Sequence, residues 1–312
     1  MNGEATDAQV ASFLTAMRMK GETPDELAAA ARIMQQSAEK IPVATDELLV
    51  DIVGTGGDGS YTFNISTAAA FVASGAGLRI AKHGNRAVSS RCGSADLIEA
   101  LGICIDITPV MAARCIDEIG IGFLFAQTMH PAMRHVARAR KQMGIRTMFN
   151  ILGPLTNPAG ADIQVVGVYD PALSKKIAGV LGHLNKKRAF VVHGHDGLDE
   201  LSICSDTDIY DICDGAIRSY TVSPHDFGFA GYNAEDIRGG DPAQNAAIVL
   251  KVFEGQAGAP RDVVCLNAAA AIMAAGCADD LHEGIALARN AIDSGAAMKK
   301  LERLRAFVGS AL

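Results

Sequence analysis

The sequence lacks several features that mark specialised classes of protein. Its 312 residues contain no apolar run near the roughly 20 residues that a membrane-spanning helix needs. Its seven cysteines are odd in number and include no C-x-x-C pair. Most of them lie in apolar segments, as Cys104, Cys115 and Cys265 do. We therefore expect no disulfides, no structural zinc and no membrane contact, in a protein of the reducing cytoplasm.

Basic charge is also scarce. The formal net charge is −7, and the basic residues are scattered along the chain rather than clustered. The sequence therefore predicts no nucleic-acid-binding surface, and any bound anion must be held by local groups. Hydrophobic residues make up 49% of the chain, which is enough to bury a large core.

Local patterns predict helices at the N-terminus and a βαβ unit after them. The Thr-Pro-Asp-Glu sequence at 23–26 is a capping box with proline at the first helical position, and residues 1–40 are predicted to form two helices. Residues 48–81 predict a strand, a glycine loop, a helix and a second strand. Residues 108–143 are predicted to be helical throughout. Further strands are expected at 164–169, 188–193 and 248–253, and helices near 266–276 and 279–308.

Together these patterns predict an α/β fold. We expect a large domain with a mainly parallel central sheet flanked by helices, and a small all-helical domain. The small domain is assigned to residues 1–46 and 105–148, and the large α/β domain to residues 47–104 and 149–312.

The densest functional signal is a glycine loop at residues 51–59, Asp-Ile-Val-Gly-Thr-Gly-Gly-Asp-Gly, between a predicted strand and a predicted helix. Such loops bring backbone amides close to phosphates, and the helix N-terminus adds about half a positive charge. The loop also matches G-x-G-x-x-G, but a dinucleotide site needs an acid after the second strand. Here that strand ends in Lys-His-Gly-Asn-Arg at 82–86. A glycine turn without a ligand and a Walker-type loop are the alternatives, although no Gly-Lys-Ser/Thr follows.

Polar side chains cluster after this loop. Four of them, Thr62, Asn64, Ser66 and Thr67, precede or begin a predicted helix. Helix capping would explain only one or two of these side chains. They favour a polyphosphate ligand over simple capping. Lys82 lies at the carboxyl end of a predicted strand, where ligands of α/β folds collect, although a solvated surface lysine is the alternative.

An acidic pair, Asp199 and Glu200, follows the predicted strand 188–193. Magnesium prefers one or two carboxylates together with water and substrate phosphate oxygens. An acidic solvated loop is the alternative. His193 and His195 could instead suggest a transition metal, but no third ligand stands at a suitable spacing.

In these motifs the chain resembles the anthranilate phosphoribosyltransferases. The motifs that carry the resemblance span nearly the whole chain: Gly-Thr-Gly-Gly-Asp at 54–58, Phe-Asn-Ile-Ser-Thr at 63–67, Lys-His-Gly-Asn-Arg at 82–86, Gly-Ser-Ala-Asp at 93–96, Phe-Asn-Ile-Leu-Gly-Pro-Leu-Thr-Asn-Pro at 149–158 and Gly-Leu-Asp-Glu at 197–200. The resemblance implies a nucleoside phosphorylase/phosphoribosyltransferase-like fold, with the active site at the hinge between domains. It implies a homodimer formed through the helical domains.

The resemblance also implies an activity. Enzymes of this family use magnesium and transfer the phosphoribosyl group of phosphoribosyl pyrophosphate (PRPP) to the amine of anthranilate, with release of pyrophosphate, in tryptophan biosynthesis. Carried over by motif, the PRPP-binding residues are Gly54, Gly57, Asp58, Thr62, Asn64, Ile65, Ser66, Thr67, Lys82, His83, Gly84, Asn85, Arg86, Ala87, Val88, Ser89, Ser90 and Ser94. The implied magnesium ligands are Ser66, Asp199 and Glu200, and the implied anthranilate contacts are Gly54, Asn85 and Arg140.

No general base is assigned, because an aryl amine is unprotonated at neutral pH. The resemblance also implies that His83, His130 and Pro154 line the access path of the aromatic substrate. Cys92 stands where the family usually has serine, which predicts a weaker polar contact near the phosphate loop. The sequence begins about one helix later than typical members, in the region through which the family dimerises.

A related pyrimidine nucleoside phosphorylase is a rival interpretation. Its usual loop runs Lys-x-Ser-Thr-Gly-Gly, whereas here Asp51 precedes Val-Gly-Thr-Gly-Gly at 53–57. A family relative that had turned to binding nucleic acid would have lost motif residues and gained basic charge. The sequence shows neither change.

The arginine-rich helix predicted over 130–143 allows a separate argument. Arg134, Arg138 and Lys141 share one stripe of this helix, whereas Arg140 shares the apolar stripe with Met133, Val136, Ala137 and Met143. Arg140 is therefore predicted to point inward. A buried guanidinium needs an anionic partner, for which the carboxylate of anthranilate and an internal Asp or Glu are the candidates.

Overall fold

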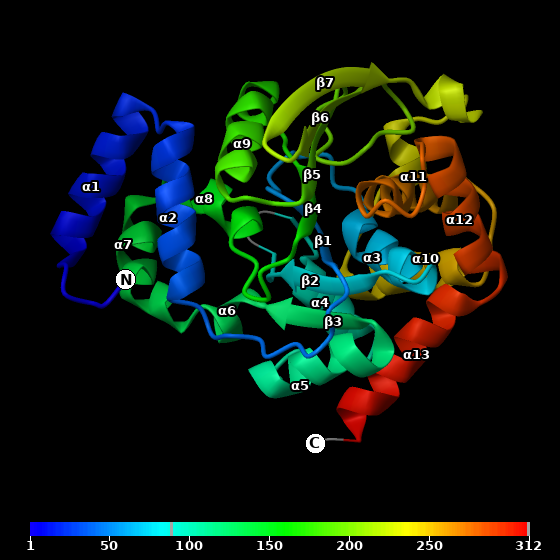
Figure 1. Ribbon diagram of the computed structural model, residues 1–312, viewed down its shortest axis with the longest axis horizontal. Helices are drawn as coiled ribbons and strands as arrows, with labels where there is room; N and C mark the ends of the chain where they lie inside the picture. The colour runs from blue at the N-terminus through cyan, green and yellow to red at the C-terminus, as the bar shows by residue number, and fades with distance from the viewer. Residues whose placement is uncertain (88–89, 311–312) are drawn as a thin grey trace.

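A seven-stranded sheet forms the centre of the computed structural model, which describes residues 1–87 and 90–310 (Figure 1). The strands, in chain order, are β1 (Leu49–Gly54), β2 (Arg79–Gly84), β3 (Ile121–Phe125), β4 (Ile163–Gly167), β5 (Arg188–Gly194), β6 (Thr207–Cys213) and β7 (Ala216–Val222). They lie in the order β3-β2-β1-β4-β5-β6-β7. The first five are parallel, and β6 and β7 are antiparallel additions at one edge. The predicted mainly parallel sheet is confirmed.

Helices cover both faces of the sheet and extend beyond one side of it. The α-helices are α1 (Asp7–Lys20), α2 (Pro24–Gln36), α3 (Ile65–Gly75), α4 (Ser94–Ala100), α5 (Pro109–Arg114), α6 (Ala126–Met129), α7 (Arg134–Met143), α8 (Phe149–Leu152), α9 (Pro171–His183), α10 (Pro242–Phe253), α11 (Ala259–Ala274), α12 (Leu281–Asp293) and α13 (Ala296–Gly309). No helix in the described part of the chain is long and apolar enough to cross a bilayer.

Two apolar cores form because successive strand residues point to opposite faces of the sheet. In β4, Val165 packs into the core shared with α3 and α11, whereas Val166 packs into the core shared with α2 and α9. The first core is the larger, and the small residues of α3 and α11 allow these two helices to approach closely.

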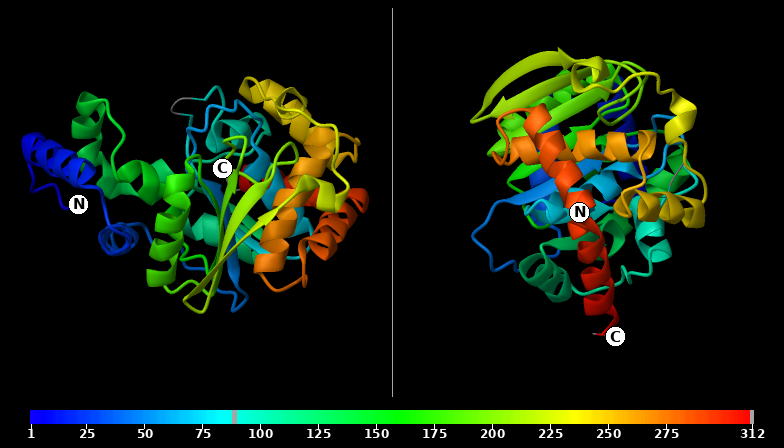
Figure 2. Two further views of the ribbon diagram at one scale, coloured as in Figure 1. Left: turned by 90° about the horizontal axis from the view of Figure 1, so that it is seen from above. Right: turned by 90° about the vertical axis from the view of Figure 1, so that its right-hand side faces the viewer.

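The two N-terminal helices lie in a separate lobe. Figure 2 shows α1 and α7 projecting from the sheet domain, with α2 between them and α9. α1 and α2 each begin with a capping box, at Thr6 and Thr23, which confirms the two helices predicted for residues 1–40.

Three local predictions are wrong. The segment 108–143 is not helical throughout, because Gly120 adopts a left-handed conformation that ends the helical segment, and Ile121–Phe125 then pairs with β2. Residues 121–125 of the segment assigned to the small helical domain therefore belong to the sheet. Residues 248–253 are not a strand but the end of α10, which begins at the Asp241 capping box. The hairpin β6–β7 was not anticipated.

Candidate active site

Polar residues gather at the carboxyl ends of the parallel strands. Gly54 ends β1, Gly84 ends β2 and Gly194 ends β5. The chain adds strands on one side of β1 up to β3 and then continues on the other side with β4. Ligands of open α/β sheets bind at the carboxyl ends of strands where the order reverses in this way. The glycine loop and the acidic pair therefore meet where a ligand is expected.

Two hydrogen bonds join the acidic pair to the phosphate-loop region. The backbone N–H of Gly56 donates to Oδ2 of Asp199 at 2.7 Å, and that of Ser66 donates to Oε1 of Glu200 at 3.2 Å. A Cβ atom added at Gly54 would lie 2.4 Å from the same Asp199 oxygen. The loop can approach Asp199 this closely because position 54 is glycine.

The electrostatics of this pair favour a cation. Glu200 is buried, and burial first and the Asp199 charge second raise its pKa well above the ordinary value. Burial first and the Asp58 charge second raise the pKa of Asp199. Neither carboxylate thus has enough positive charge nearby to offset its burial. The cation of buried Lys82 lowers the pKa of Glu200 only in part.

Magnesium fits this donor set. Within residues 1–87 and 90–310, no group of three or more His, Cys, Asp or Glu side chains is arranged to hold a metal by itself. A pair of carboxylates suits magnesium, which takes one or two such ligands and completes its shell with water and phosphate oxygens. Asp199 and Glu200 therefore match a metal that arrives with a phosphate ligand better than a metal in an all-protein cage.

The two histidines near this pair have other partners. Nδ1 of His193 lies 2.8 Å from the carbonyl oxygen of Val168, and Nε2 of His195 lies 3.0 Å from Asp208. They do not form a metal cluster with any third residue that the structure describes.

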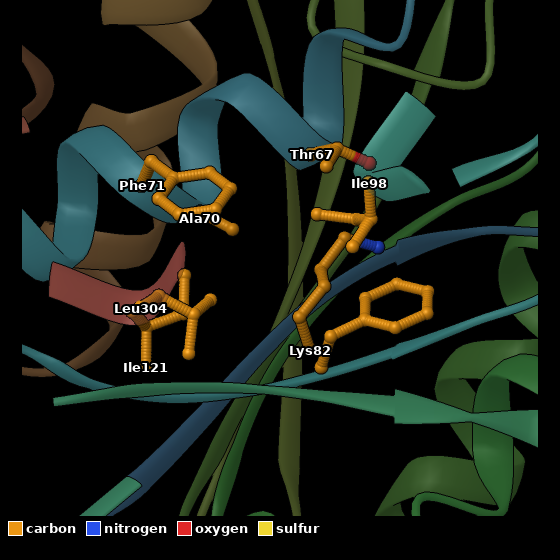
Figure 3. Close-up of a pocket in the computed structure, with 8 residues that line it drawn as sticks. Thr67, Ala70, Phe71, Lys82, Ile98, Ile121 and Leu304 are labelled. Carbon is orange, nitrogen blue, oxygen red and sulfur yellow. The ribbon is translucent and has the colours of Figure 1, made fainter. Parts of the chain in front are cut away.

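Lys82 is buried, so the solvated-lysine alternative is wrong. Its side chain is 3% exposed, and burial lowers its pKa. Figure 3 shows Lys82 and Thr67 beside one small, mostly apolar space that Ile98 also lines. The hydroxyl of Thr67 has no hydrogen-bond partner among the described residues. The nearby charges of Asp51, Glu200 and Asp199 act against this lowering of the Lys82 pKa, which places the ammonium beside the acidic pair.

Asp51 and Asn157 hold β1 and β2 together next to Lys82. Oδ1 of Asp51 accepts from the backbone N–H of His83 at 3.1 Å, and Oδ2 accepts from Nδ2 of Asn157 at 2.8 Å. Asn157 also donates to the carbonyl of Ala81 at 2.7 Å. Neither side chain has a role predicted from the sequence, although Asp51 lies in the 51–59 motif and Asn157 in the 149–158 motif.

The segment between β2 and α4 is anchored at its two ends. The backbone N–H of Asn85 donates to Oγ of Ser94 at 3.1 Å, and the carbonyl of Asn85 accepts from Ala95 at 3.1 Å. The guanidinium of Arg86 pairs with Asp96 at 3.0 Å and also with Glu99. Both ion-pair partners of Arg86 therefore lie on α4. The predicted ligands Val88 and Ser89 lie outside the described residues.

His83, near the carboxyl end of β2, packs against His130, with ring centroids 5.1 Å apart and ring planes tilted by 54°. Burial lowers the pKa of His83 to about 3 and that of His130 to about 4. The Nε2 atoms of both rings have no partner among the described residues. Two neutral rings side by side suit a flat aromatic ligand better than an anion.

Arg140 is partly buried on α7, as predicted from its place on the helix. Its guanidinium lies 5.1 Å from the ring centroid of Phe149, and no described residue forms an ion pair with it. Arg138 is 77% exposed and pairs with Asp7 at 3.2 Å. The apolar stripe predicted for this helix is wrong at one position, because Ala137 is exposed and Ala139 is buried instead. Arg140 thus has the unpaired cation that a carboxylate ligand requires.

Arg146 was not anticipated. Its guanidinium donates to the carbonyl of Gly57 at 3.1 Å and lies 4.5 Å from the ring centroid of Tyr169. It connects the segment after α7 to the glycine loop. Nothing in the sequence distinguishes this arginine from other exposed ones.

Comparison with known proteins places the chain in a family. A family model described as the glycosyl transferase family, a/b domain, matches residues 46–298, and the helical bundle domain model matches residues 1–38. The chain therefore belongs to this glycosyl transferase family.

Similar proteins define the family more narrowly. The anthranilate phosphoribosyltransferase of Moorella thermoacetica is 56% identical over 311 residues, covering 99% of this chain and 91% of the relative. The crystal structure of the Thermus thermophilus enzyme superposes with a TM-score of 0.93 at 45% identity, covering 98% of this chain and 92% of that one. The chain belongs to the anthranilate phosphoribosyltransferase family.

Two structures from Saccharomyces cerevisiae are also similar. The anthranilate phosphoribosyltransferase in complex with PRPP and Mg has a TM-score of 0.91 at 32% identity, covering 97% of this chain and 86% of that chain. The same enzyme in complex with 4-fluoroanthranilate has a TM-score of 0.88 at 31% identity, with the same coverage of 97% and 86%.

Proposed function

We propose that this protein transfers the phosphoribosyl group of PRPP to the amine of anthranilate, giving N-(5-phosphoribosyl)anthranilate and pyrophosphate, a reaction of tryptophan biosynthesis. The observation that carries the proposal is the meeting of the glycine loop, Lys82 and the acidic pair at the carboxyl edge of β1, β2 and β5. The yeast structures with PRPP, Mg and a fluorinated anthranilate support it, because the chain shares their fold over nearly its whole length.

The PRPP site in this proposal is formed by the two loops and the start of α3. Backbone amides of the 54–59 loop and Lys82 bind the phosphate groups, as amide-lined loops near helix N-termini do. Asp199, Glu200 and Ser66 hold magnesium, which would neutralise the charge of the leaving pyrophosphate. The proposal draws support from the hydrogen bond of the Ser66 N–H to Glu200 and from the unbalanced charge of the acidic pair.

Anthranilate is proposed to bind between the helical lobe and the sheet. Arg140 would bind its carboxylate, Asn85 and Gly54 would contact it at the loops, and the neutral rings of His83 and His130 would line its path. Support comes from the unpaired guanidinium of Arg140 and from the adjacent histidine rings.

The chemistry needs little proton transfer from the protein. An aryl amine is nucleophilic without a general base, so we assign none. The protein's main contributions are to align the two substrates in line and to stabilise the negative charge that develops on pyrophosphate. Lys82 would do the second directly, since its ammonium is buried close to the acidic pair.

We also propose that the protein is a cytoplasmic homodimer that assembles through the helical lobe. Phe13 and Met19 on α1 are 58% and 83% exposed, and a surface hollow lies between α1 and α7. Exposed apolar side chains on this lobe favour a self-complementary contact. The seven free cysteines support a reducing compartment. Light scattering of the purified protein, compared with its Phe13→Glu variant, tests the dimer.

The experiment that tests the activity follows the loss of anthranilate fluorescence on addition of PRPP and magnesium. We expect turnover that requires all three components and stops when magnesium is chelated. Phosphate and a pyrimidine nucleoside, offered in place of PRPP and anthranilate, should give no base release. Nucleoside cleavage without anthranilate consumption would overturn the proposal.

A further inference from the structure

The side chain of Asn64 has an unusual place for a residue just before a helix. It stands at the N-cap position of α3 but makes no capping hydrogen bond. Its Nδ2 instead donates to the carbonyl oxygen of Cys92 at 3.1 Å. Its Oδ1 accepts from Nδ2 of Asn245 at 3.0 Å and from Sγ of Cys92 at 3.2 Å. Both lone pairs of this oxygen are therefore used within the protein.

Asn245 comes from a distant part of the chain. It lies on α10, 181 residues after Asn64, and its side chain is 1% exposed. Its Oδ1 accepts the backbone N–H of Gly240 at 2.7 Å. A buried amide with both ends bonded has one orientation, because reversing it would break both bonds.

The segment before α10 is closely packed against the residues before Asn64. Thr62 and Arg238 form an antiparallel bridge, and the N–H of Gly239 donates to the carbonyl of Tyr61 at 2.8 Å. A Cβ atom at Gly239 would lie 2.6 Å from the nitrogen of Phe63. This segment therefore holds the backbone of Asn64 in place, while Asn245 holds its side chain.

The hydrogen bonds run in series from Gly240 through Asn245 and Asn64 to Cys92. The groups at the two ends of this series fix the direction of each bond within it. The backbone N–H of Gly240 can only donate, so Asn245 presents its oxygen there and its Nδ2 to Asn64. The carbonyl of Cys92 can only accept, so Asn64 presents its Nδ2 there and its oxygen to Asn245. The second N–H of Asn64 has no acceptor among the described residues.

We propose that Asn245 is a positioning residue for PRPP binding: together with the carbonyl of Cys92 it fixes the amide of Asn64, so that an N–H, and not an oxygen, faces the phosphate-binding site. An oxygen in that place would repel an anionic ligand, whereas an N–H donates to it. Asn245 itself touches no substrate. The inference rests on the proposed function, because it takes PRPP as the ligand of the loop that Asn64 follows.

The first test replaces the donor by an acceptor of the same shape. Asn245→Asp can still accept the Gly240 N–H but cannot donate to Asn64. We expect it, and Asn245→Ala, to raise the KM for PRPP about tenfold and to change the KM for anthranilate less than about twofold. Asn64→Asp replaces the donating N–H group of residue 64 by an oxygen while Asn245 stays in place. It should weaken PRPP binding more than Asn64→Ala does.

A double-mutant cycle separates positioning from general packing. If Asn245 acts through Asn64, Asn245→Ala adds less than about a twofold rise in the KM for PRPP once Asn64 is already alanine. Ser74→Ala is the matched control. It removes a buried hydroxyl bonded at 3.0 Å to Gly120 at the other end of α3, and it should lower the melting temperature without changing the KM for PRPP.

Three results would overturn the inference: an equal rise in the KM for PRPP with and without Asn64, equal rises for both substrates, or Asn64→Asp and Asn245→Asp proteins that bind PRPP as the native protein does. Native protein without any turnover of anthranilate would reject the proposed function instead. Titration calorimetry with PRPP and magnesium, in the absence of anthranilate, provides the binding measurement for variants that are too slow to assay.

Discussion

The backbone N–H of Gly56 donates to a carboxylate oxygen of Asp199 at 2.7 Å, which joins two parts of the chain that are 143 residues apart. One end of this bond belongs to the glycine loop and the other to the acidic pair. Any ligand that binds the loop through its phosphates therefore lies beside the carboxylates. This contact joins the glycine loop and the acidic pair in one site.

Neutralising the acidic pair should impair activity without unfolding the protein. In Asp199→Asn with Glu200→Gln, we expect turnover to fall more than about 100-fold at limiting magnesium and the magnesium requirement to rise. Stability should stay the same or increase, because two buried and mutually repelling carboxylates are removed. A magnesium titration and a melting curve measure the two effects. Asp214→Asn with Glu302→Gln, both at exposed positions, is the control. An unchanged magnesium titration would remove the metal role.

Cys92→Ser should be tolerated and should leave the KM for PRPP equal or lower. The Cys92 thiol lies 3.2 Å from the amide oxygen of Asn64, and burial raises its pKa to about 11, so it is a neutral, weak donor. A serine hydroxyl donates more strongly at the same place. Cys265→Ser, at a fully buried position in α11, should instead lose about 1–3 kcal/mol of stability with no change in KM. A loss of that size at Cys92 would show that its thiol serves mainly as packing.

Arg140→Ala should raise the KM for anthranilate about ten- to hundred-fold, since a charge-assisted hydrogen bond contributes about 1.5–3 kcal/mol. The KM for PRPP should change far less. Arg138→Ala is the matched control on the same helix, because an exposed ion pair such as that with Asp7 contributes at most about 1 kcal/mol. Initial rates over both substrate concentrations provide the comparison. Equal effects on both substrates, or a collapse of the melting temperature, would contradict this role.

The histidine pair should make the protein sensitive to acid. His130 has a folded pKa of about 4, below its unfolded value of about 6.5. A lowered histidine pKa leaves stability fully present above pH 6.5, and stability is lost as the pH falls toward 4. The loss amounts to roughly 3 kcal/mol for this ring once it is complete. His130→Asn should therefore show a smaller fall in unfolding free energy between pH 7 and pH 4 in urea titrations. Parallel curves for the two proteins would contradict the buried neutral state of His130.

Local sequence signals predicted the helices and strands whose ends are set by neighbouring residues in the sequence, such as capping residues and turn glycines. Thr6 and Thr23 begin the first two helices, and the glycine loop follows a strand as expected. The same reasoning failed where two local signals compete. Residues 248–253 have β-branched character, but they follow the Asp241 capping box and continue that helix. The hairpin carries an Asp-Gly turn at 214–215, with both residues at positive φ, and this dipeptide is itself a hairpin signal in the sequence.

The sequence by itself determined the kind of site, because the residue types that bind phosphate, magnesium and a carboxylate stand in recognisable motifs whatever the surrounding fold. Only the tertiary structure decided which of those side chains are free to act. Arg86 is paired with α4 carboxylates, whereas Arg140 has no ionic partner among the described residues. It also brought Asn157 to Asp51 and Asn245 to Asn64, across 106 and 181 residues. Hydrogen bonds at such separations depend on how helices and strands pack, and no periodicity or local spacing records that packing.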